Sequence, residues 1–304
     1  MIHISTPLRI CLLGGSTDNP HFISKYNKSH IISFTSNYKT HVSLSKPDYD
    51  PVKNYYINGF TSQKTKHREN IKNDLVFMVF EHFNIPPVYL SMTSDIQSNG
   101  CGLASSSSFL ISLIQACCKF TQTTMSQYEI GKLALQLERK INPYTGYQDP
   151  FGCLFEGFKS LYSKDDEIYD IQYVANELRQ YYNFDLIPTG VNRFSMKILE
   201  DISKNVDKIL PLYDLSLHGL ELLRRQEYKQ FIQCINENWK IKKSTSKLIT
   251  QNKKVRDLDE FCEKRDEILA HKLLGAGNGG FFLVVTRKNE PLTSNIFNVI
   301  LRNA

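Results

Sequence analysis

No hydrophobic run in this sequence is long enough to cross a membrane. The longest apolar stretches, such as residues 109–114 and 281–285, fall far short of the roughly 20 residues that a transmembrane helix needs. A signal peptide is not expected either, because His3 and Arg9 interrupt the apolar start and no small-residue cleavage site follows it. We therefore predict a protein without a membrane partner.

Cysteine is scarce and its pattern is uninformative for disulfides or metals. The chain has 7 cysteines among 304 residues, an odd number, and no Cys-x-x-Cys pair. Cys117 and Cys118 are adjacent within a predicted helix. These observations exclude a disulfide-rich small domain and predict reduced core cysteines in a cytoplasmic protein.

A strong excess of one charge is also missing. Lysine and arginine total 37 against 31 aspartates and glutamates, a net charge of +6 that is dispersed along the chain. No DNA- or RNA-reading motif appears, so we expect no nucleic-acid partner and regard anionic small molecules as at least equally suitable. With 41% hydrophobic residues and a mean hydropathy of −0.33, the composition is globular and excludes wholesale disorder.

Hydrophobic periodicity predicts an α+β protein with two domains, residues 1–180 and 181–304. Residues 46–73 are expected to form an irregular excursion or hairpin, since prolines, glycine and charges interrupt them. A helix is expected to begin at Ser105 and another near Gln148. The other expected strands are 2–13, 30–35, 41–45, 88–92, 169–174, 185–189 and 281–285, and the other expected helices are 126–141, 194–204, 215–225, 227–243 and 255–273.

The most informative segment is the glycine- and serine-rich turn at residues 98–108. Gly100 and Gly102 allow backbone amides to approach a polyphosphate, and the helix that follows directs its positive end toward the same place. The hydroxyl groups at 105–107 add donors, and one of them could bind Mg²⁺. The segment is equally compatible with a core helix that is simply capped by serine.

A second glycine segment spans residues 274–280. Gly275, Gly277 and Gly280 satisfy the G-x-G-x-x-G spacing of dinucleotide binders. We expect a helix before these glycines and a strand after them, which is the reverse of the dinucleotide-binding order. A dinucleotide- or methyl-donor-binding protein is therefore disfavoured, and the G-x-x-x-x-G-K-[ST] spacing is missing as well.

Three charged residues fall at positions that could be either functional or structural. Arg9 lies in an apolar strand and Asp18 lies just beyond a diglycine turn, where a buried ion pair and a capped turn are the structural alternatives. Glu138 falls at the edge of an apolar helix stripe. A carboxylate there needs a cation, and the structural alternative is a salt bridge to Arg139 or Lys132.

Taken in order, these segments resemble the motifs of the GHMP kinases. The first motif is Pro-Leu-Arg-Ile at 7–10 with Gly-Gly-Ser-Thr-Asp at 14–18, the phosphate loop is 100–107, and the third motif is 272–281. Gly-Tyr-Gln-Asp at 146–149 is similar to the segment that carries the family's catalytic aspartate. Together with residues 189–193 and 239–244, these features look most similar to sugar 1-kinases of the D-glycero-D-manno-heptose 7-phosphate kinase type.

The resemblance implies a two-domain α+β fold with ATP and a sugar phosphate in the cleft between the domains. It implies that Asp149 orients or deprotonates the anomeric hydroxyl, that Arg9 keeps Asp149 ionised, and that Ser106 and Glu138 hold Mg²⁺. The residues implied for the ATP phosphates are Gly100, Gly102, Leu103, Ala104, Ser105, Ser106 and Ser107.

The resemblance also implies a set of acceptor-binding residues. Asp18 would hydrogen-bond sugar hydroxyls with help from Thr17, and Gly277 of the third motif would lie against the substrate. Arg193, Lys242 and Lys243 are the candidates for a clamp on the 7-phosphate. The two lysines could equally lie on the solvated face of a helix together with Lys240 and Lys247.

This sequence departs from the family pattern at four positions: Asn19, Ala104, Pro150 and Asn278. None of them removes a reacting group. Ala104 and Asn278 stand where glycine is usual, so loop geometry is the property most affected. Other GHMP kinases of galactose, fucose or mevalonate type, a sugar or nucleotide sensor without turnover, and a homodimer all stay open.

Overall fold

The computed structural model describes residues 1–47, 50–59, 61–96, 100–165, 167–175, 177–191 and 195–292. In this part of the chain the strands form a seven-stranded and a three-stranded sheet. The strands are β1 (Ile2–Leu13), β2 (Ser29–Ser45), β3 (Tyr55–Asn58), β4 (Ser62–Thr65), β5 (Tyr89–Ser94), β6 (Phe158–Lys164), β7 (Glu167–Tyr173), β8 (Tyr182–Pro188), β9 (Ala270–Leu273) and β10 (Phe281–Arg287).

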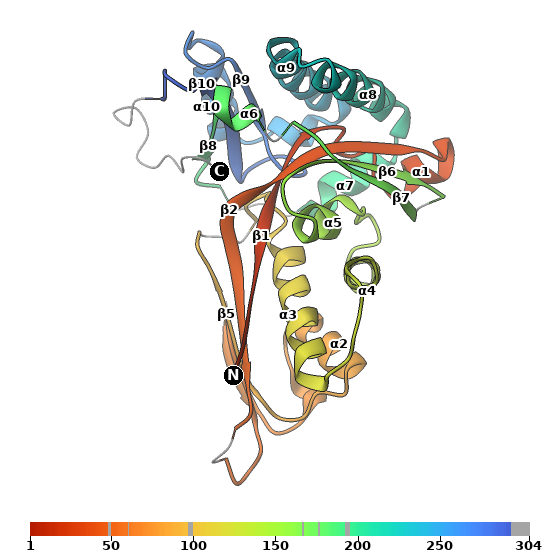
Figure 1. Ribbon diagram of the computed structural model, residues 1–304, viewed down its shortest axis with the longest axis vertical. Helices are drawn as coiled ribbons and strands as arrows, with labels where there is room; N and C mark the ends of the chain where they lie inside the picture. The colour runs from red at the N-terminus through yellow and green to blue at the C-terminus, as the bar shows by residue number, and fades with distance from the viewer. Residues whose placement is uncertain are drawn as a thin grey trace.

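The first sheet is dominated by the long antiparallel pair of β1 and β2 (Figure 1). The sequence predicted two strands where β2 is one strand of 17 residues. The register shifts between Pro7 and Arg9, because Leu8 alone lies opposite the three β2 residues 36–38. Such irregularities turn a side chain relative to the sheet, and this one lies next to Arg9.

Helices cover one face of this sheet and enclose its core. They are α2 (Asp74–His82), α3 (Ser105–Thr121), α4 (Gln127–Ile141) and α5 (Gln148–Leu154). The helix α4 begins with a capping box, because Ser126 and Glu129 each bond the other's backbone amide. Apolar side chains of α3, such as Leu110 and Ile114, pack with those of α4 and the long strands. This packing fixes the start of α3 and the position of α5 beside β1.

The second sheet has the strand order β8-β10-β9 and belongs to the C-terminal part of the chain. The remaining helices are α1 (Pro20–Tyr26), α6 (Leu178–Tyr181), α7 (Ser195–Ser203), α8 (Leu210–Arg224), α9 (Tyr228–Thr245) and α10 (Lys253–Glu263), with short 3₁₀ turns at Arg68–Asn70, Val206–Ile209 and Lys247–Thr250. One hydrophobic cluster joins Leu8 and Leu12 of β1 to Leu283 and Val285 of β10. The division at residue 180 therefore crosses a continuous apolar interface, and it stays a prediction.

The strands β9 and β6 are among the elements that differ from the sequence-based expectation. The predicted helix 255–273 ends at Glu263, and its last residues form β9, which pairs with β10 and is completely buried. Strand β6 was not predicted and lies between β2 and β7. The second glycine segment thus joins two antiparallel strands. A dinucleotide fingerprint must open a helix. Because this glycine segment connects two strands instead, the structure disfavours dinucleotide binding.

Among the described residues, no helix combines the length and the apolar character that crossing a bilayer requires.

Candidate active site

A cleft of roughly 400 Å³ lies where the end of β1, the start of α3, α5 and the β9–β10 connection meet. In Figure 1 these elements converge between the helices around α3 and the C-terminal helices. The charged residues that line the cleft come from both parts of the chain: Arg9, Asp18, Glu138, Asp149, Lys242 and Lys272. The cleft thus combines three carboxylates with three cations.

Arg9 connects the aspartate of α5 to the glycine- and serine-rich turn. Its side chain is only 2% exposed. Nε and Nη2 both donate to Asp149 Oδ1, at 3.0 and 2.5 Å, and Nη1 donates to the Gly102 carbonyl oxygen at 2.9 Å. Asp149 is one-third exposed. A buried arginine with three hydrogen bonds therefore holds a partly open carboxylate beside the turn at the start of α3.

The turn itself presents backbone amides to the cleft. Gly100, Gly102 and Ala104 have φ values of 64°, 82° and 60°, and Ala104 occupies the N-cap position of α3 without a side-chain cap bond. The serine-capped alternative is therefore wrong, and the first amides of the helix stay available to an anion. Ala104 accepts a left-handed conformation that costs a non-glycine residue roughly 1 kcal/mol.

The second glycine segment contacts this turn directly. A Cβ atom built on Gly280, whose φ is 95°, would lie 2.3 Å from the Cys101 carbonyl oxygen. Asn278 has a φ of 61°, as its tolerance of the left-handed region predicts, and its Oδ1 accepts from the Asn252 amide at 2.8 Å. The contact at Gly280 aligns the two glycine segments along one side of the cleft.

Glu138 is buried at the edge of the cleft without a cationic partner among the described residues. Ser107 donates to its Oε1 at 2.6 Å, whereas Oε2 has no hydrogen-bond partner in the described part of the chain. Lys132 pairs instead with Glu167 at 2.7 Å, and Arg139 donates to the Thr145 carbonyl oxygen at 2.9 Å. The salt-bridge alternative for Glu138 is therefore wrong.

These residues fit a divalent cation. Burial and the Asp149 carboxylate raise the pKa of Glu138 to about 7, against the opposing effect of the Ser107 and Ser106 hydroxyls. Ser106 is exposed on the first turn of α3 and lines the same cleft. An unpartnered carboxylate oxygen beside an accessible hydroxyl is a suitable donor set for Mg²⁺, which prefers oxygen ligands.

Asp18 and Asp149 are connected through Gln148. The Gln148 amide nitrogen donates to Asp18 Oδ2 at 3.1 Å, and its side-chain Nε2 donates to Asp149 Oδ1 at 3.3 Å. Burial and the nearby Asp149 raise the pKa of Asp18 to about 6. A Cβ atom on Gly146 would lie 2.0 Å from Asp18 Oδ2, so glycine is needed there. The sequence analysis quoted Gln148 within a motif but gave it no role.

The chain is similar to known kinases in part of its length and in its overall sequence. Residues 70–157 match the model of the GHMP kinases N-terminal domain. The chain is 24% identical to the D-glycero-alpha-D-manno-heptose 7-phosphate kinase of Campylobacter jejuni, in an alignment that covers 92% of this chain and 88% of that relative. The chain thus contains a segment similar to the GHMP kinases N-terminal domain, and over most of its length it is similar to a kinase of heptose 7-phosphate.

Solved structures agree on the GHMP kinase fold. A structure described as a D-glycero-D-manno-heptose 1-phosphate kinase from Bacteroides thetaiotaomicron has a TM-score of 0.74 at 17% identity, covering 95% of this chain and 89% of its own. Streptococcus pneumoniae phosphomevalonate kinase, solved with phosphomevalonate and AMPPNP, has a TM-score of 0.77 at 15% identity, covering 99% of this chain and 100% of its own. The predicted mixed α+β fold is confirmed, and kinase relatives support a phosphotransferase that uses ATP.

Several residues predicted for this GHMP kinase site do not line the cleft. Thr17 is fully buried and bonds Ser29 and the His30 carbonyl oxygen. Ser107 lies behind Glu138, to which its hydroxyl donates. The other predicted residues missing from the cleft lining are Leu103, Lys243 and Gly277. Arg193 lies outside the described residues.

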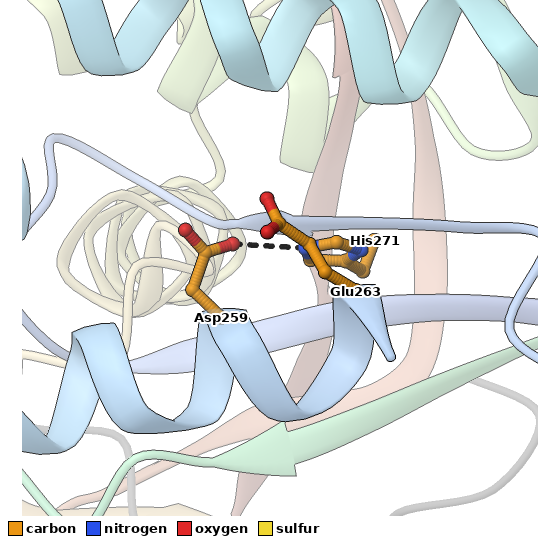
Figure 2. Close-up of side chains that lie close together, drawn as sticks. All are labelled: Asp259, Glu263 and His271. Carbon is orange, nitrogen blue, oxygen red and sulfur yellow. Dashed lines mark hydrogen bonds and ion pairs between the residues drawn. The ribbon is translucent and has the colours of Figure 1, made fainter. Parts of the chain in front are cut away.

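Lys243 belongs to a separate ion-pair network. Its Nζ lies 2.7 Å from Asp259 and 3.3 Å from Glu263. Figure 2 shows these two carboxylates of α10 beside His271, whose Nε2 is 2.8 Å from Asp259 Oδ1. The three side chains could ligate a metal, but the Lys243 ammonium already forms ion pairs with both carboxylates. The structure therefore contradicts Lys243 as a clamp residue, because its neighbour Lys242 faces the cleft instead.

The raised pKa of Glu138 predicts a pH dependence of the ligand-free kinase. Its ordinary value is 4.5 and its folded value is about 7, so the folded state binds more protons than the unfolded state between these pH values. Stability should fall as pH rises from about 4.5 to about 7, by on the order of 3 kcal/mol. Glu138→Gln should remove most of this decline in urea unfolding measured without nucleotide or metal.

The smaller contribution of Asp18 to the pH dependence of stability should remain in Glu138→Gln. Its pKa is raised from 3.8 to about 6, so a residual decline confined to lower pH is expected. Glu129→Gln, at an exposed capping position, is the matched control and should keep the wild-type decline near neutral pH. Parallel curves for wild type and Glu138→Gln would contradict the prediction.

Proposed function

We propose that this chain is an ATP-dependent sugar 1-kinase. It transfers the γ-phosphoryl group to the anomeric hydroxyl of D-glycero-D-manno-heptose 7-phosphate, giving the 1,7-bisphosphate for nucleotide-activated heptose synthesis in the cytoplasm. The observation that carries the proposal is the bridge formed by Arg9, which bonds both Asp149 and the Gly102 carbonyl oxygen. The bridge sets a carboxylate beside the turn that would hold the phosphates. The 24% identity to the Campylobacter jejuni kinase supports the choice of acceptor.

Each residue of the cleft has a role in this reaction. The anomeric oxygen forms a bond to the γ-phosphorus, the bond from that phosphorus to the β,γ-bridging oxygen breaks, and ADP leaves. The hydroxyl proton passes to Asp149, which Arg9 orients through two hydrogen bonds. Amides of residues 100–106 bind the phosphates. Ser106 and Glu138 would hold Mg²⁺, which would neutralise charge on the β- and γ-phosphates.

We assign the acceptor sugar to the part of the cleft that lies away from the phosphate-binding turn. Asp18, bonded by the Gln148 amide, is suited to accept hydrogen bonds from sugar hydroxyls. Lys242 lines the cleft, and its Nζ donates to the Gly275 carbonyl oxygen beside the second glycine segment. We assign Lys242 to the 7-phosphate of the acceptor and keep Arg193 as a second candidate.

Product analysis tests the proposal directly. The protein is incubated with ATP, Mg²⁺ and heptose 7-phosphate, and the product is followed by phosphorus NMR together with ADP release. A new anomeric phosphate signal is the expected result. Turnover of galactose, fucose or mevalonate in place of the heptose would identify another GHMP kinase activity. ATP binding without turnover of any of these acceptors would favour a sensor.

Ser106→Ala tests the assigned metal ligand. Loss of the hydroxyl should raise the KM for Mg·ATP or lower kcat by about 10-fold or more, since a bond to a charged group is worth roughly 1.5–3 kcal/mol. The effect should be partly relieved by raising the Mg²⁺ concentration. Ser244→Ala, at an exposed position of α9 whose hydroxyl bonds the Ile241 carbonyl oxygen, is the control. Unchanged kinetics in Ser106→Ala would show that the metal is held elsewhere.

A further inference from the structure

Lys272 is a buried lysine of the cleft that the mechanism above leaves without a role. It lies on β9, lines the cleft, and is only 2% exposed. Its Nζ donates to the Leu12 carbonyl oxygen and to Asn238 Oδ1, each at 2.7 Å. An ammonium group has three donors, so these two neutral acceptors leave one donor unused.

The charge of Lys272 has no counter-ion among the described residues. Arg9, which is equally buried, pairs with a carboxylate, whereas no carboxylate in the described part of the chain lies within ion-pair distance of Lys272. Burial, together with the nearby Arg9 charge, lowers its pKa. An unpaired charge withdrawn from water is costly unless an anion reaches it.

Asn238, the hydrogen-bond partner of Lys272, also has a donor group without an acceptor. Asn238 is 1% exposed, and its Oδ1 is occupied by Lys272. Its Nδ2 is buried without a partner among the described residues. Of the two residues only Lys272 lines the cleft; it offers an unsatisfied donor and a positive charge there, which suit an oxyanion, and Asn238 holds its ammonium group in place.

We propose that the Lys272–Asn238 pair is a phosphate-binding subsite of the cleft, and that the phosphate it takes is the one carried by the acceptor. This inference rests on the proposed function, because that function supplies a phosphorylated acceptor. The nucleotide phosphates already have the amides of residues 100–106 and the Ser106–Glu138 pair. Lys272 instead belongs to the C-terminal sheet, as a neighbour of Leu274, Gly275 and Ala276, which line the cleft together with Lys242.

A comparison of the phosphorylated acceptor with its unphosphorylated counterpart provides the first test. Lys272→Met keeps most of the side-chain length and removes the charge. Its KM for heptose 7-phosphate should rise about 10- to 100-fold, while the KM for unphosphorylated heptose and for ATP should change less than about twofold. Lys240→Met, at an exposed position of α9, is the control and should leave all three values unchanged. Equal rises for both acceptors, or a rise confined to ATP, would overturn the assignment to the acceptor phosphate.

The Asn238→Asp variant distinguishes a phosphate-binding role of Lys272 from a purely structural one. This nearly isosteric change gives Lys272 an internal carboxylate partner, so a purely structural lysine would be unaffected or more stable. Under the proposal, the new counter-ion should weaken phosphate binding as strongly as Lys272→Met, with an unchanged or raised melting temperature. Retention of the wild-type KM for heptose 7-phosphate in Asn238→Asp would contradict the subsite, even if Lys272→Met failed to fold.

Inorganic phosphate makes the test independent of turnover. Its binding to the protein loaded with Mg·AMPPNP is measured by phosphorus NMR titration. Wild type and Lys240→Met should bind, and both Lys272→Met and Asn238→Asp should lose binding at least 10-fold. If heptose 7-phosphate is not turned over but phosphate binds in this Lys272-dependent way, the proposed sugar is wrong and the subsite stands. If all four proteins bind phosphate equally, the subsite is wrong whatever the acceptor.

Discussion

Replacing Asp149 by asparagine is expected to lower kcat by about 10²- to 10⁴-fold, the usual contribution of a positioned general base. The change removes the proton acceptor but keeps an oxygen at the Oδ1 position, where Arg9 Nε and Nη2 both donate. Arg9 therefore keeps its hydrogen bonds, including the one to the Gly102 carbonyl oxygen. Nucleotide affinity should stay within about twofold of the wild-type value.

Steady-state kinetics and a direct nucleotide-binding measurement together check this prediction. Asp214→Asn, at an exposed position of α8, is the matched control and should leave kcat unchanged. Near-normal turnover in Asp149→Asn would remove Asp149 from the chemistry. Loss of nucleotide binding with intact folding would instead mean that the carboxylate acts mainly by holding the loop around Gly102.

The predicted residues that the structure brings into the cleft were recognisable from local chain properties. The turn before α3 is recognisable because Gly100 and Gly102 take left-handed conformations that only a few residues tolerate. Glu138 is predictable because α4 is strongly amphipathic and its stripe fixes which positions meet buried surface. Its raised pKa and missing partner follow from the same local position.

The prediction that the structure contradicts, Lys243 as a clamp residue, depends on how the helices and strands are rotated relative to one another. Lys242 and Lys243 are adjacent, and periodicity does not decide which of them faces the cleft. The choice is made by packing, because Trp239 is buried and donates to Asp259 at 2.6 Å, and Asp259 also binds Lys243. The indole thereby turns the Lys243 side of α9 away from the cleft.

Strand β9 was missed for a related reason. Its four residues, Ala-His-Lys-Leu, include two that are usually exposed, yet all four are buried. They form a strand because β10 supplies the pairing, for example between Leu273 and Phe282. Lys272 could not be recognised as a cleft residue before that pairing was known, since a helix through the same position would orient its side chain differently.

Replacing Arg9 by lysine should lower kcat by about 10²-fold even though the positive charge is kept. Lysine cannot reproduce the fork that donates to Asp149 and the Gly102 carbonyl oxygen at once. A misplacement of the carboxylate by about 1 Å is enough for an effect of this size. The KM for ATP should rise as well, because the turn that contains Gly102 loses its side-chain link to β1 and keeps only the backbone bond from the Arg9 amide to the Leu103 carbonyl oxygen.

The combination of this change with Asp149→Asn shows whether Arg9 works through Asp149. If it does, the double variant should be about as slow as Asp149→Asn alone, since a group that positions a carboxylate has nothing left to position once that carboxylate is gone. The ATP effect should persist, because it arises from Gly102. Losses in kcat that multiply would instead show that Arg9 also meets the transferred phosphoryl group, independently of Asp149.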